Sequence, residues 1–183
     1  MRVKKMKPID KTASLNKNII LLNGPSSAGK STLAKKLQTL VAEQKNERYM
    51  IVSIDDFMKM SPEETIYEDD VFEISGAMCE RVLEILKDCP GVIIDHVITS
   101  ERIFNQLKEM LHSYDLQMVH VTCPLEVLQK REKERGNRCL GSAQASYEYL
   151  FPKEGYDLTV DTHRMTAAEC AKSIFDRVIN KDI

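Results

Sequence analysis

The sequence lacks three features that would place the protein in a special class: an excess of charge of one sign, a long apolar run, and paired cysteines. Its 26 Lys and Arg residues nearly balance 28 Asp and Glu residues, which gives a formal net charge of −2. This balance argues against nucleic acid as the main partner, because proteins that bind polyanions are basic. No apolar run approaches the roughly 18 residues that a membrane span requires, so no membrane partner is expected.

The five cysteines are scattered, include no C-x-x-C pair and are odd in number. They predict neither a disulfide framework nor a zinc site, and each is interpreted as a small core side chain. The first residues lack the apolar core of a signal peptide, so the expected location is the cytoplasm. Residues 1–17 are rich in lysine and predict a mobile arm, followed by one domain over residues 18–183. The sequence leaves the oligomeric state open.

The most informative stretch is an apolar run that ends in a glycine turn and opens a helix. Residues 24–31, which we call the phosphate loop, match the pattern G-x-x-x-x-G-K-[ST]. Glycines allow backbone conformations in which successive N–H groups turn toward phosphates at the start of a helix. Lys30 would reach the β- and γ-phosphates, and the Ser31 hydroxyl would ligate Mg²⁺.

An ordinary glycine turn is the alternative interpretation of the phosphate loop. The apolar strand before the loop and the amphipathic helix after it favour nucleotide binding, because these are the neighbours that such a motif requires. The residues assigned to the nucleotide are Gly24, Pro25, Ser26, Ser27, Ala28, Gly29, Lys30, Ser31 and Thr32.

Short apolar runs alternate with amphipathic helical patterns through the rest of the chain. The predicted strands cover residues 19–22, 50–54, 92–94, 116–122 and 158–160. This alternation is typical of an α/β domain with a mostly parallel sheet. Helices are expected to start at Ser75, near Ser100, and at Thr166, which has Glu169 at capping-box spacing.

Three of the predicted strands are followed by an aspartate, and ligands of parallel sheets bind beyond the carboxyl ends of the strands. Asp55, Asp95 and Asp161 are therefore expected along one rim with the phosphate loop. Asp95 is expected to join Ser31 at Mg²⁺, although a strand-end acid can also simply cap a turn. Asp55 is the candidate base that accepts a hydroxyl proton. The adjacent Asp56 leaves this assignment open, and the roles of Asp55 and Asp95 could be exchanged.

Arg131, Arg135 and Arg138 recur at a spacing that places them on one side of a helix and its continuation. Guanidinium groups in this arrangement can grip phosphate oxygens and offset charge on a transferring group. Arg135 and Arg138 are therefore catalytic candidates, and Arg131 is a candidate nucleotide ligand. The alternative is a solvated charged helix, of which the intervening residues 132–134 are typical. Bordering glycines favour a moving segment, an arginine-bearing lid over about residues 131–145.

The acidic segment 57–74 follows Asp55 and is expected to border the acceptor substrate. Its charge would favour a cationic or polyhydroxylated compound, and a solvated loop is the alternative. His96 is a candidate hydrogen-bond partner of the substrate. The other three histidines have no metal-ligand spacing and are assigned no role.

These segments together resemble the chloramphenicol phosphotransferase-like family of P-loop kinases. The resemblance is carried by residues 20–31, 52–55, 93–97, 131–138 and 156–162. They follow the family's order over nearly the whole chain, and several motifs in register are more specific than one. The resemblance implies a P-loop kinase-type three-layer α/β fold, with a five-stranded mostly parallel sheet flanked by helices and a small arginine-bearing lid.

The resemblance also implies an activity and the residues that perform it. ATP, with Mg²⁺, would phosphorylate a hydroxyl group on a small molecule, with Asp55 as the base. Lys30 and Ser31 would contact the nucleotide and Mg²⁺, and the arginines would form the lid. The loop after Asp161 and Thr162 would border the adenine, which makes both residues candidates for cofactor binding.

Two departures keep the acceptor open. The segment after Asp55 looks shorter than in the antibiotic-modifying member, and residues 149–152 replace a valine-histidine pair of that member. Chloramphenicol therefore does not follow as the substrate. A nucleoside, sugar or nucleotide-sugar kinase remains an alternative, as does an ATP-binding switch or interaction module without an acceptor.

Overall fold

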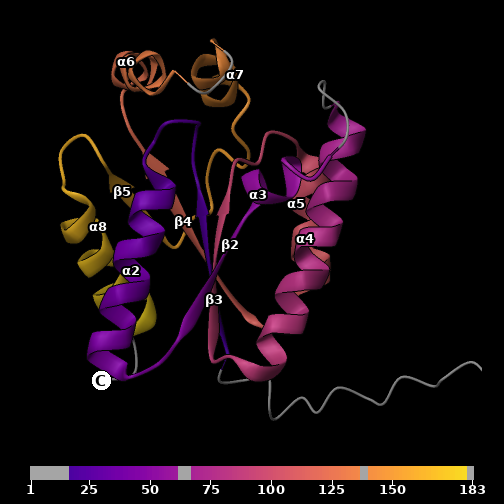
Figure 1. The fold of residues 1–183 in the computed structure, drawn as a ribbon, viewed down its shortest axis with the longest axis vertical. Coiled ribbons are helices and arrows are strands. Elements are labelled where there is room, and N and C mark those ends of the chain that lie inside the picture. The colour runs from indigo at the N-terminus through magenta and orange to yellow at the C-terminus, as the bar shows by residue number, and fades with distance from the viewer. Residues whose placement is uncertain (1–16, 62–66, 137–139, 181–183) are drawn as a thin grey trace, which may run out of the picture.

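The computed structural model describes residues 17–61, 67–136 and 140–180, which form three layers with a sheet in the middle (Figure 1). The strands are β1 (Asn18–Asn23), β2 (Tyr49–Ser53), β3 (Gly91–His96), β4 (Asp115–Thr122) and β5 (Leu158–Asp161). All are parallel and lie in the order β2-β3-β1-β4-β5. The prediction of a five-stranded parallel α/β sheet is confirmed.

The central strand β1 shows why the strand sequences are continuously apolar. Its neighbours are β3 on one side and β4 on the other. Alternate side chains of a strand point to opposite faces of the sheet. Ile20 and Leu22 accordingly join the core under one helical layer, whereas Ile19 and Leu21 join the core under the other. Both faces are covered, so no polar alternation is tolerated.

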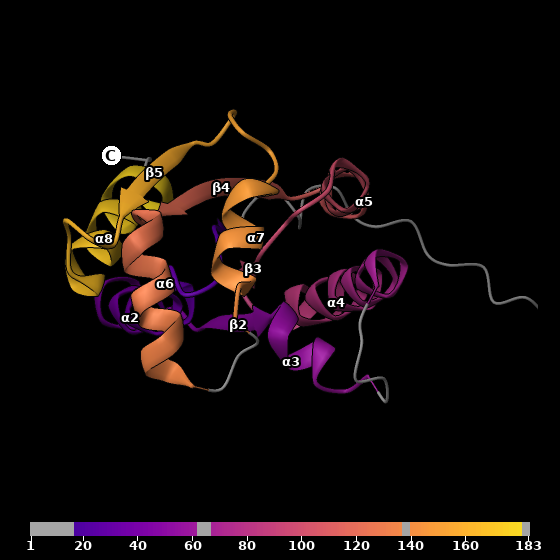
Figure 2. The ribbon, with the colours of Figure 1, turned by 90° about the horizontal axis from the view of Figure 1, so that it is seen from above.

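Helices cover both faces of the sheet. One face carries α2 (Lys30–Lys45), α8 (Ala167–Ile174) and the π-helical turn η1 (Phe175–Ile179), and the other carries α4 (Glu68–Asp88) and α5 (Glu101–Leu111). A short helix, α3 (Ile54–Met58), follows β2. The helices α6 (Leu125–Arg135) and α7 (Ser142–Glu148) lie side by side beyond the carboxyl ends of the strands (Figures 1 and 2).

The predicted helix start at Ser75 is wrong, because α4 begins at Glu68. The acidic residues that looked like part of a loop form the first turn of this helix, where carboxylates are favourable beside the positive end of the helix dipole. The backbone N–H of Tyr67 also donates to the Asp70 carboxylate at 2.7 Å. Ser75 instead lies within α4, and its side chain is buried.

The other two helix starts are confirmed. The Ser100 hydroxyl accepts a hydrogen bond from the Ile103 backbone N–H at the start of α5. Thr166 and Glu169 form the predicted capping box at the start of α8, with each side chain satisfying the backbone N–H of the other residue.

Several sequence predictions fall on residues outside the described ranges. The N-terminal arm up to residue 16, residues 62–66 of the acidic segment and Arg138 belong to this group. Within the ranges that the structure covers, no helix combines the length and the apolar character needed to cross a bilayer.

Gly24 generates a stability prediction, because an added Cβ would lie 2.1 Å from the backbone oxygen of Val121. We expect Gly24→Ala to lower the free energy of unfolding by about 1–3 kcal/mol through overpacking. Urea unfolding followed by circular dichroism measures this loss.

Gly76→Ala is the matched control for this substitution. Its Cβ would lie 3.0 Å from the amide nitrogen of Gln106. That nitrogen is at the far end of a flexible side chain, which can move aside. Alanine favours the helix, so Gly76→Ala should be neutral or stabilising. A Gly24→Ala protein as stable as the wild type would contradict the close packing of the phosphate loop against β4.

Candidate active site

The phosphate loop connects β1 to α2 at the carboxyl edge of the sheet, below α6 in Figure 1. Two of its residues have left-handed backbone conformations, Ser27 with φ 65° and Gly29 with φ 85°. Such angles are unfavourable for a serine and occur where the surrounding structure enforces them. A chain that alternates between helical hands presents successive N–H groups as a concave anion site. The loop therefore has the backbone form that its sequence predicts.

Lys30 begins α2 and folds back over the loop. Its ammonium group donates to the backbone oxygen of Pro25 at 2.9 Å and lies 3.9 Å from a carboxylate oxygen of Asp95. The side chain is only 6% exposed. A buried ammonium needs such partners, because removal from water penalises its charge. The positive charge is thus held at the point where the loop meets β3.

Ser31 and Asp95, the two predicted Mg²⁺ ligands, lie together. The Ser31 hydroxyl donates to the Asp95 carboxylate at 2.6 Å. Both are hard oxygen donors of the kind that Mg²⁺ prefers, and Mg²⁺ usually keeps waters and substrate phosphates as its other ligands. Among the described residues, no group of three or more His, Cys, Asp or Glu side chains forms a metal cage. The pair therefore fits a magnesium ion shared with a nucleotide.

Asp55 and Asp56 occupy the first turn of α3, directly after β2. Asp56 is 72% exposed and pairs with Lys59 at 3.2 Å, within the same short stretch of chain. Asp55 is only partly exposed. Asp55 is therefore the less exposed of the two acids. The Asp55 carboxylate raises the pKa of His96, whereas the Lys30 ammonium lowers it.

His96 is the last residue of β3 and lies inside the fold. It is fully buried, and its Nε2 lies 3.0 Å from the Ser75 hydroxyl of α4. The pKa of His96 is lowered to about 4, mainly by burial and also by the charge of Lys30, while a backbone hydrogen bond at Val97 and the charge of Asp55 oppose the shift. The imidazole is thus neutral near pH 7, and with no exposed surface it does not offer the substrate contact suggested by the sequence.

A cavity of about 490 Å³ opens beside the phosphate loop, between α6 and the loop after β5. Its lining includes Ser27, Gly29, Thr32, Arg131, Arg135 and Thr162. The guanidinium of Arg131 donates to the backbone oxygens of Ser27 and Thr162 at 3.5 and 3.0 Å. The Thr162 hydroxyl donates to the Ala28 backbone oxygen at 2.8 Å. The predicted nucleotide residues from three distant segments therefore border one space.

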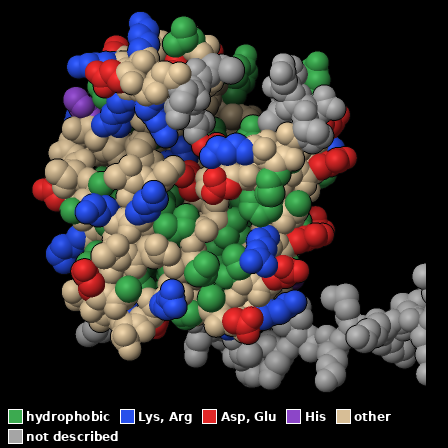
Figure 3. Space-filling model, viewed as in Figure 1, with side chains coloured by type: hydrophobic (Ala, Val, Ile, Leu, Met, Phe, Trp, Pro, Cys, Tyr) green, Lys and Arg blue, Asp and Glu red, His purple; other side chains and the backbone are tan. Residues whose placement is uncertain are grey.

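Arg135 and Asp161 differ from the residues that contact the loop directly. Arg135 is exposed and lines this cavity. Figure 3 shows Lys and Arg side chains gathered near α6. The Asp161 carboxylate accepts the backbone N–H groups of His163 and Arg164 at 2.8 and 3.3 Å. It therefore shapes the turn that places Thr162. Arg138 lies outside the described residues.

A second cavity of about 440 Å³ lies between the starts of α4 and α5 and the helix α7. It includes side chains with hydroxyl groups, two of them tyrosines, and one carboxylate. These residues are Tyr67, Glu68, Thr99, Ser142, Ser146 and Tyr149. Ser146, which lines this cavity, also accepts the backbone N–H of Ser26 in the phosphate loop.

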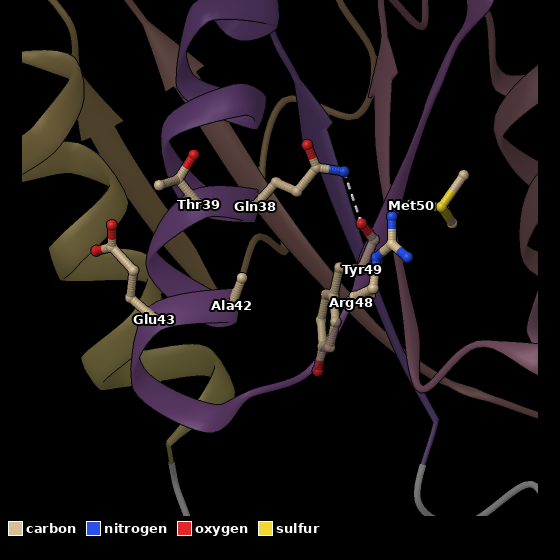
Figure 4. A pocket seen from close by; sticks show the side chains of 7 residues that line it. All are labelled: Gln38, Thr39, Ala42, Glu43, Arg48, Tyr49 and Met50. Atoms are coloured by element: carbon tan, nitrogen blue, oxygen red, sulfur yellow. Dashed lines mark hydrogen bonds between the residues drawn. The ribbon is translucent and has the colours of Figure 1, made fainter.

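A third hollow of about 450 Å³ lies at the far end of α2 (Figure 4). There the Gln38 amide donates to the backbone oxygen of Tyr49 at 2.7 Å and covers the start of the edge strand β2. This hollow faces the amino ends of the strands, whereas ligands of parallel sheets bind at the carboxyl ends. We therefore exclude it from the site.

Sequence reasoning missed the polar residues that hold the site together. The Asn23 amide, buried just before Gly24, donates to the Phe151 backbone oxygen at 2.8 Å and the Tyr156 hydroxyl at 2.7 Å. Its oxygen accepts the Ile98 N–H at 3.0 Å. The sequence did offer one signal for Asn23: it is a polar residue at the end of an apolar run, directly before the loop.

Glu132 and Ser146 had no comparable signal in the sequence. The interpretation of residues 132–134 as a solvated face is wrong for Glu132, which is only 3% exposed. Its partners are backbone N–H groups nine and eleven residues away, at Gly141 and Ala143. Neither sequence spacing nor helical periodicity reports such contacts.

The fold and the phosphate loop define a P-loop kinase. The family model for chloramphenicol phosphotransferase-like proteins matches residues 17–179, and the chain therefore belongs to this family. The family resemblance inferred from the sequence and the kinase assignment are confirmed. No curated protein sequence matches the chain significantly.

Solved structures share the fold at low sequence identity. APS kinase of Mycobacterium tuberculosis, in complex with AMPPNP and APS, is 17% identical with a TM-score of 0.74, over 90% of this chain and 99% of that chain. A gluconokinase from Sinorhizobium meliloti is 21% identical with a TM-score of 0.66, over 91% and 94%. Shikimate kinase from Acinetobacter baumannii, in complex with shikimate, is 18% identical with a TM-score of 0.64, over 94% and 99%.

His96 generates a pH prediction. Its folded pKa of about 4 lies below its ordinary value of 6.5, so between these values the unfolded state binds more protons. Stability should therefore fall as the pH drops through this window. His96→Gln removes the effect, so its loss of unfolding free energy between about pH 7 and 4.5 should be smaller by roughly 2–3 kcal/mol.

Urea unfolding at the two pH values measures this difference. His112→Gln, which replaces an exposed histidine, is the control and should keep the wild-type pH dependence. If His96→Gln loses as much stability on acidification as the wild type, then the imidazole is not held neutral by burial.

Proposed function

We propose that the protein is an ATP-dependent O-phosphotransferase that moves the γ-phosphoryl group to a hydroxyl of a small molecule. The observation that carries this proposal is the convergence of Lys30, Ser31 and Asp95 at one end of the phosphate loop, which also lines a cavity. This cavity suits the nucleoside of ATP. The second cavity, which α7 borders together with the starts of α4 and α5, suits the acceptor.

On the nucleotide side, the loop N–H groups and Lys30 would hold the triphosphate. Ser31 and Asp95 would hold Mg²⁺, which when bound would neutralise phosphate charge. Arg131 and Thr162 would border the nucleoside, and Arg135 would reach the phosphates from the rim, with Arg138 as the predicted second arginine. A guanidinium offsets charge in the transition state because it binds two phosphate oxygens at once.

On the acceptor side, Asp55 would act as the general base. Its carboxylate would take the hydroxyl proton as the acceptor oxygen bonds to the γ-phosphorus, and the bond to the β-phosphate oxygen would break to release ADP. α6 and α7 cover the carboxyl edge of the sheet (Figure 2). Their closure would exclude water, so that the alcohol rather than solvent receives the phosphoryl group.

The lining of the acceptor cavity favours a neutral or cationic alcohol. Glu68 contributes a carboxylate, and Thr99 and Ser142 contribute hydroxyl groups that can bind polyhydroxylated compounds. Tyr67 and Tyr149 are exposed there and can pack against a ring. No lysine or arginine occurs among the described lining residues, so an anionic acceptor would meet an unfavourable charge.

Substitutions at Lys30 and Asp55 test the two halves of this assignment. Lys30→Ala should reduce transfer below detection, since the triphosphate loses its buried cation. Asp55→Asn should lower kcat by about 10²–10⁴-fold and leave the Kd for ATP nearly unchanged, because a general base acts only in the chemical step. Transfer is measured with labelled ATP, and ATP binding by calorimetry.

Asp56→Asn is the matched control, since it removes the same charge from the adjacent exposed position. It should transfer phosphate at the wild-type rate. Normal turnover by Asp55→Asn, or an equal loss in Asp56→Asn, would refute Asp55 as the base.

Acceptor charge provides a separate test. Among hydroxylated compounds of matched size, we expect ATP-dependent phosphorylation of amines and neutral alcohols but not of carboxylates. Glu68→Gln should raise KM for amines selectively, by about three- to tenfold for the loss of one partly exposed charge. Preference for carboxylates would contradict the acceptor class. Steady ATP hydrolysis that no alcohol changes would instead favour an ATP-binding module.

A further inference from the structure

A buried carboxylate inside the predicted lid fixes α7 relative to α6. Glu132 of α6 is 3% exposed, and its two oxygens accept the backbone N–H groups of Gly141 at 2.9 Å and Ala143 at 2.7 Å. Hydrogen bonds to an ionised acceptor are stronger than neutral ones, and a buried carboxylate requires them. The start of α7 is therefore tied to α6.

Ser146 connects the same helix to the phosphate loop. Its hydroxyl oxygen accepts the backbone N–H of Ser26 at 2.8 Å, and its proton is directed to the backbone oxygens of Ser142 at 2.6 Å and Ala143 at 3.1 Å. Ser146 is only 7% exposed. Both bonding roles of the hydroxyl are therefore used, and its position is set by the turn of α7 that Glu132 anchors.

The phosphate loop is thus held at two consecutive residues by α7 and α6. Ser146 of α7 binds the N–H of Ser26, and Arg131 of α6 binds the backbone oxygen of Ser27. Ser27 has the left-handed backbone conformation that gives the loop its concave form. A strained conformation persists only when its surroundings over-determine it. The contacts from Ser146 and Arg131 restrain the backbone at this point.

We infer that Glu132 and Ser146 are positioning residues for the phosphate loop. Glu132 fixes α7, and Ser146 on α7 holds the Ser26 peptide so that the loop keeps the shape that receives a triphosphate. This inference rests on the proposed binding of ATP by the loop. Ser146 also lines the proposed acceptor cavity, so the same residue contacts the phosphate loop and borders that cavity.

The experiment measures binding of ATP and of inorganic tripolyphosphate by calorimetry, with melting temperature recorded in parallel. Tripolyphosphate probes the loop without the nucleoside cavity. Ser146→Ala leaves the Ser26 N–H unpaired, so we expect about five- to tenfold weaker binding of both ligands. Ser146→Thr retains the acceptor oxygen and should bind both within about twofold of the wild type.

Glu132→Gln tests the connection between the two residues. The amide has one oxygen for two N–H groups, so α7 should shift and both ligands should again bind about five- to tenfold more weakly. If Glu132 acts through Ser146, the double variant should lose no more affinity than either single variant. Gln144→Ala, on the exposed side of α7, is the control and should bind as the wild type does.

Three results would overturn the inference. Folded Ser146→Ala protein that binds both ligands normally, even with a lowered melting temperature, would make Ser146 merely structural. Losses that multiply in the double variant would show that Glu132 does not act through Ser146. A folded wild-type protein that binds neither ATP nor tripolyphosphate would refute the proposed function itself, and the inference with it.

Discussion

The parallel pairing of β1 with β3 is the constraint on which the site depends. Leu22 lies opposite Asp95 in this pairing, so the phosphate loop leaves β1 just where β3 presents its carboxylate. The short hydrogen bond from Ser31 to Asp95 follows from that register. A shift of one residue would turn Asp95 to the other face of the sheet, because side chains alternate along a strand. The chemistry is therefore fixed by the packing of two apolar strands.

Buried polar groups then join the distant parts of the chain to this pair of strands. Asn23 links the end of β1 to the segments near residues 98, 151 and 156. Glu132 links α6 to α7, and Ser146 links α7 to the phosphate loop. Each such group is costly unless its hydrogen bonds are made, so together they favour one arrangement over many. Apolar packing alone would leave the relative positions of loop, rim and lid less defined.

The sequence predicted the features that depend on local patterns. Apolar runs gave the five strands, the glycine pattern gave the loop, and a capping box gave the start of α8 at Thr166. It failed where tertiary contacts decide: Ser75 looked like a cap but pairs with His96, and Glu132 looked solvated but is buried. The partners of such residues are distant in sequence, so no local pattern could have indicated them.

The central claim is that a triphosphate lies in the phosphate loop with its terminal phosphate between Lys30 and Asp55. A crystal structure with Mg²⁺ and a non-hydrolysable ATP analogue tests this most directly. We predict γ-phosphate oxygens about 2.7–3.2 Å from the Lys30 ammonium, with the Asp55 carboxylate facing the open side of that phosphate. An analogue bound elsewhere, or an Asp55 carboxylate turned away from the γ-phosphate, would contradict the account.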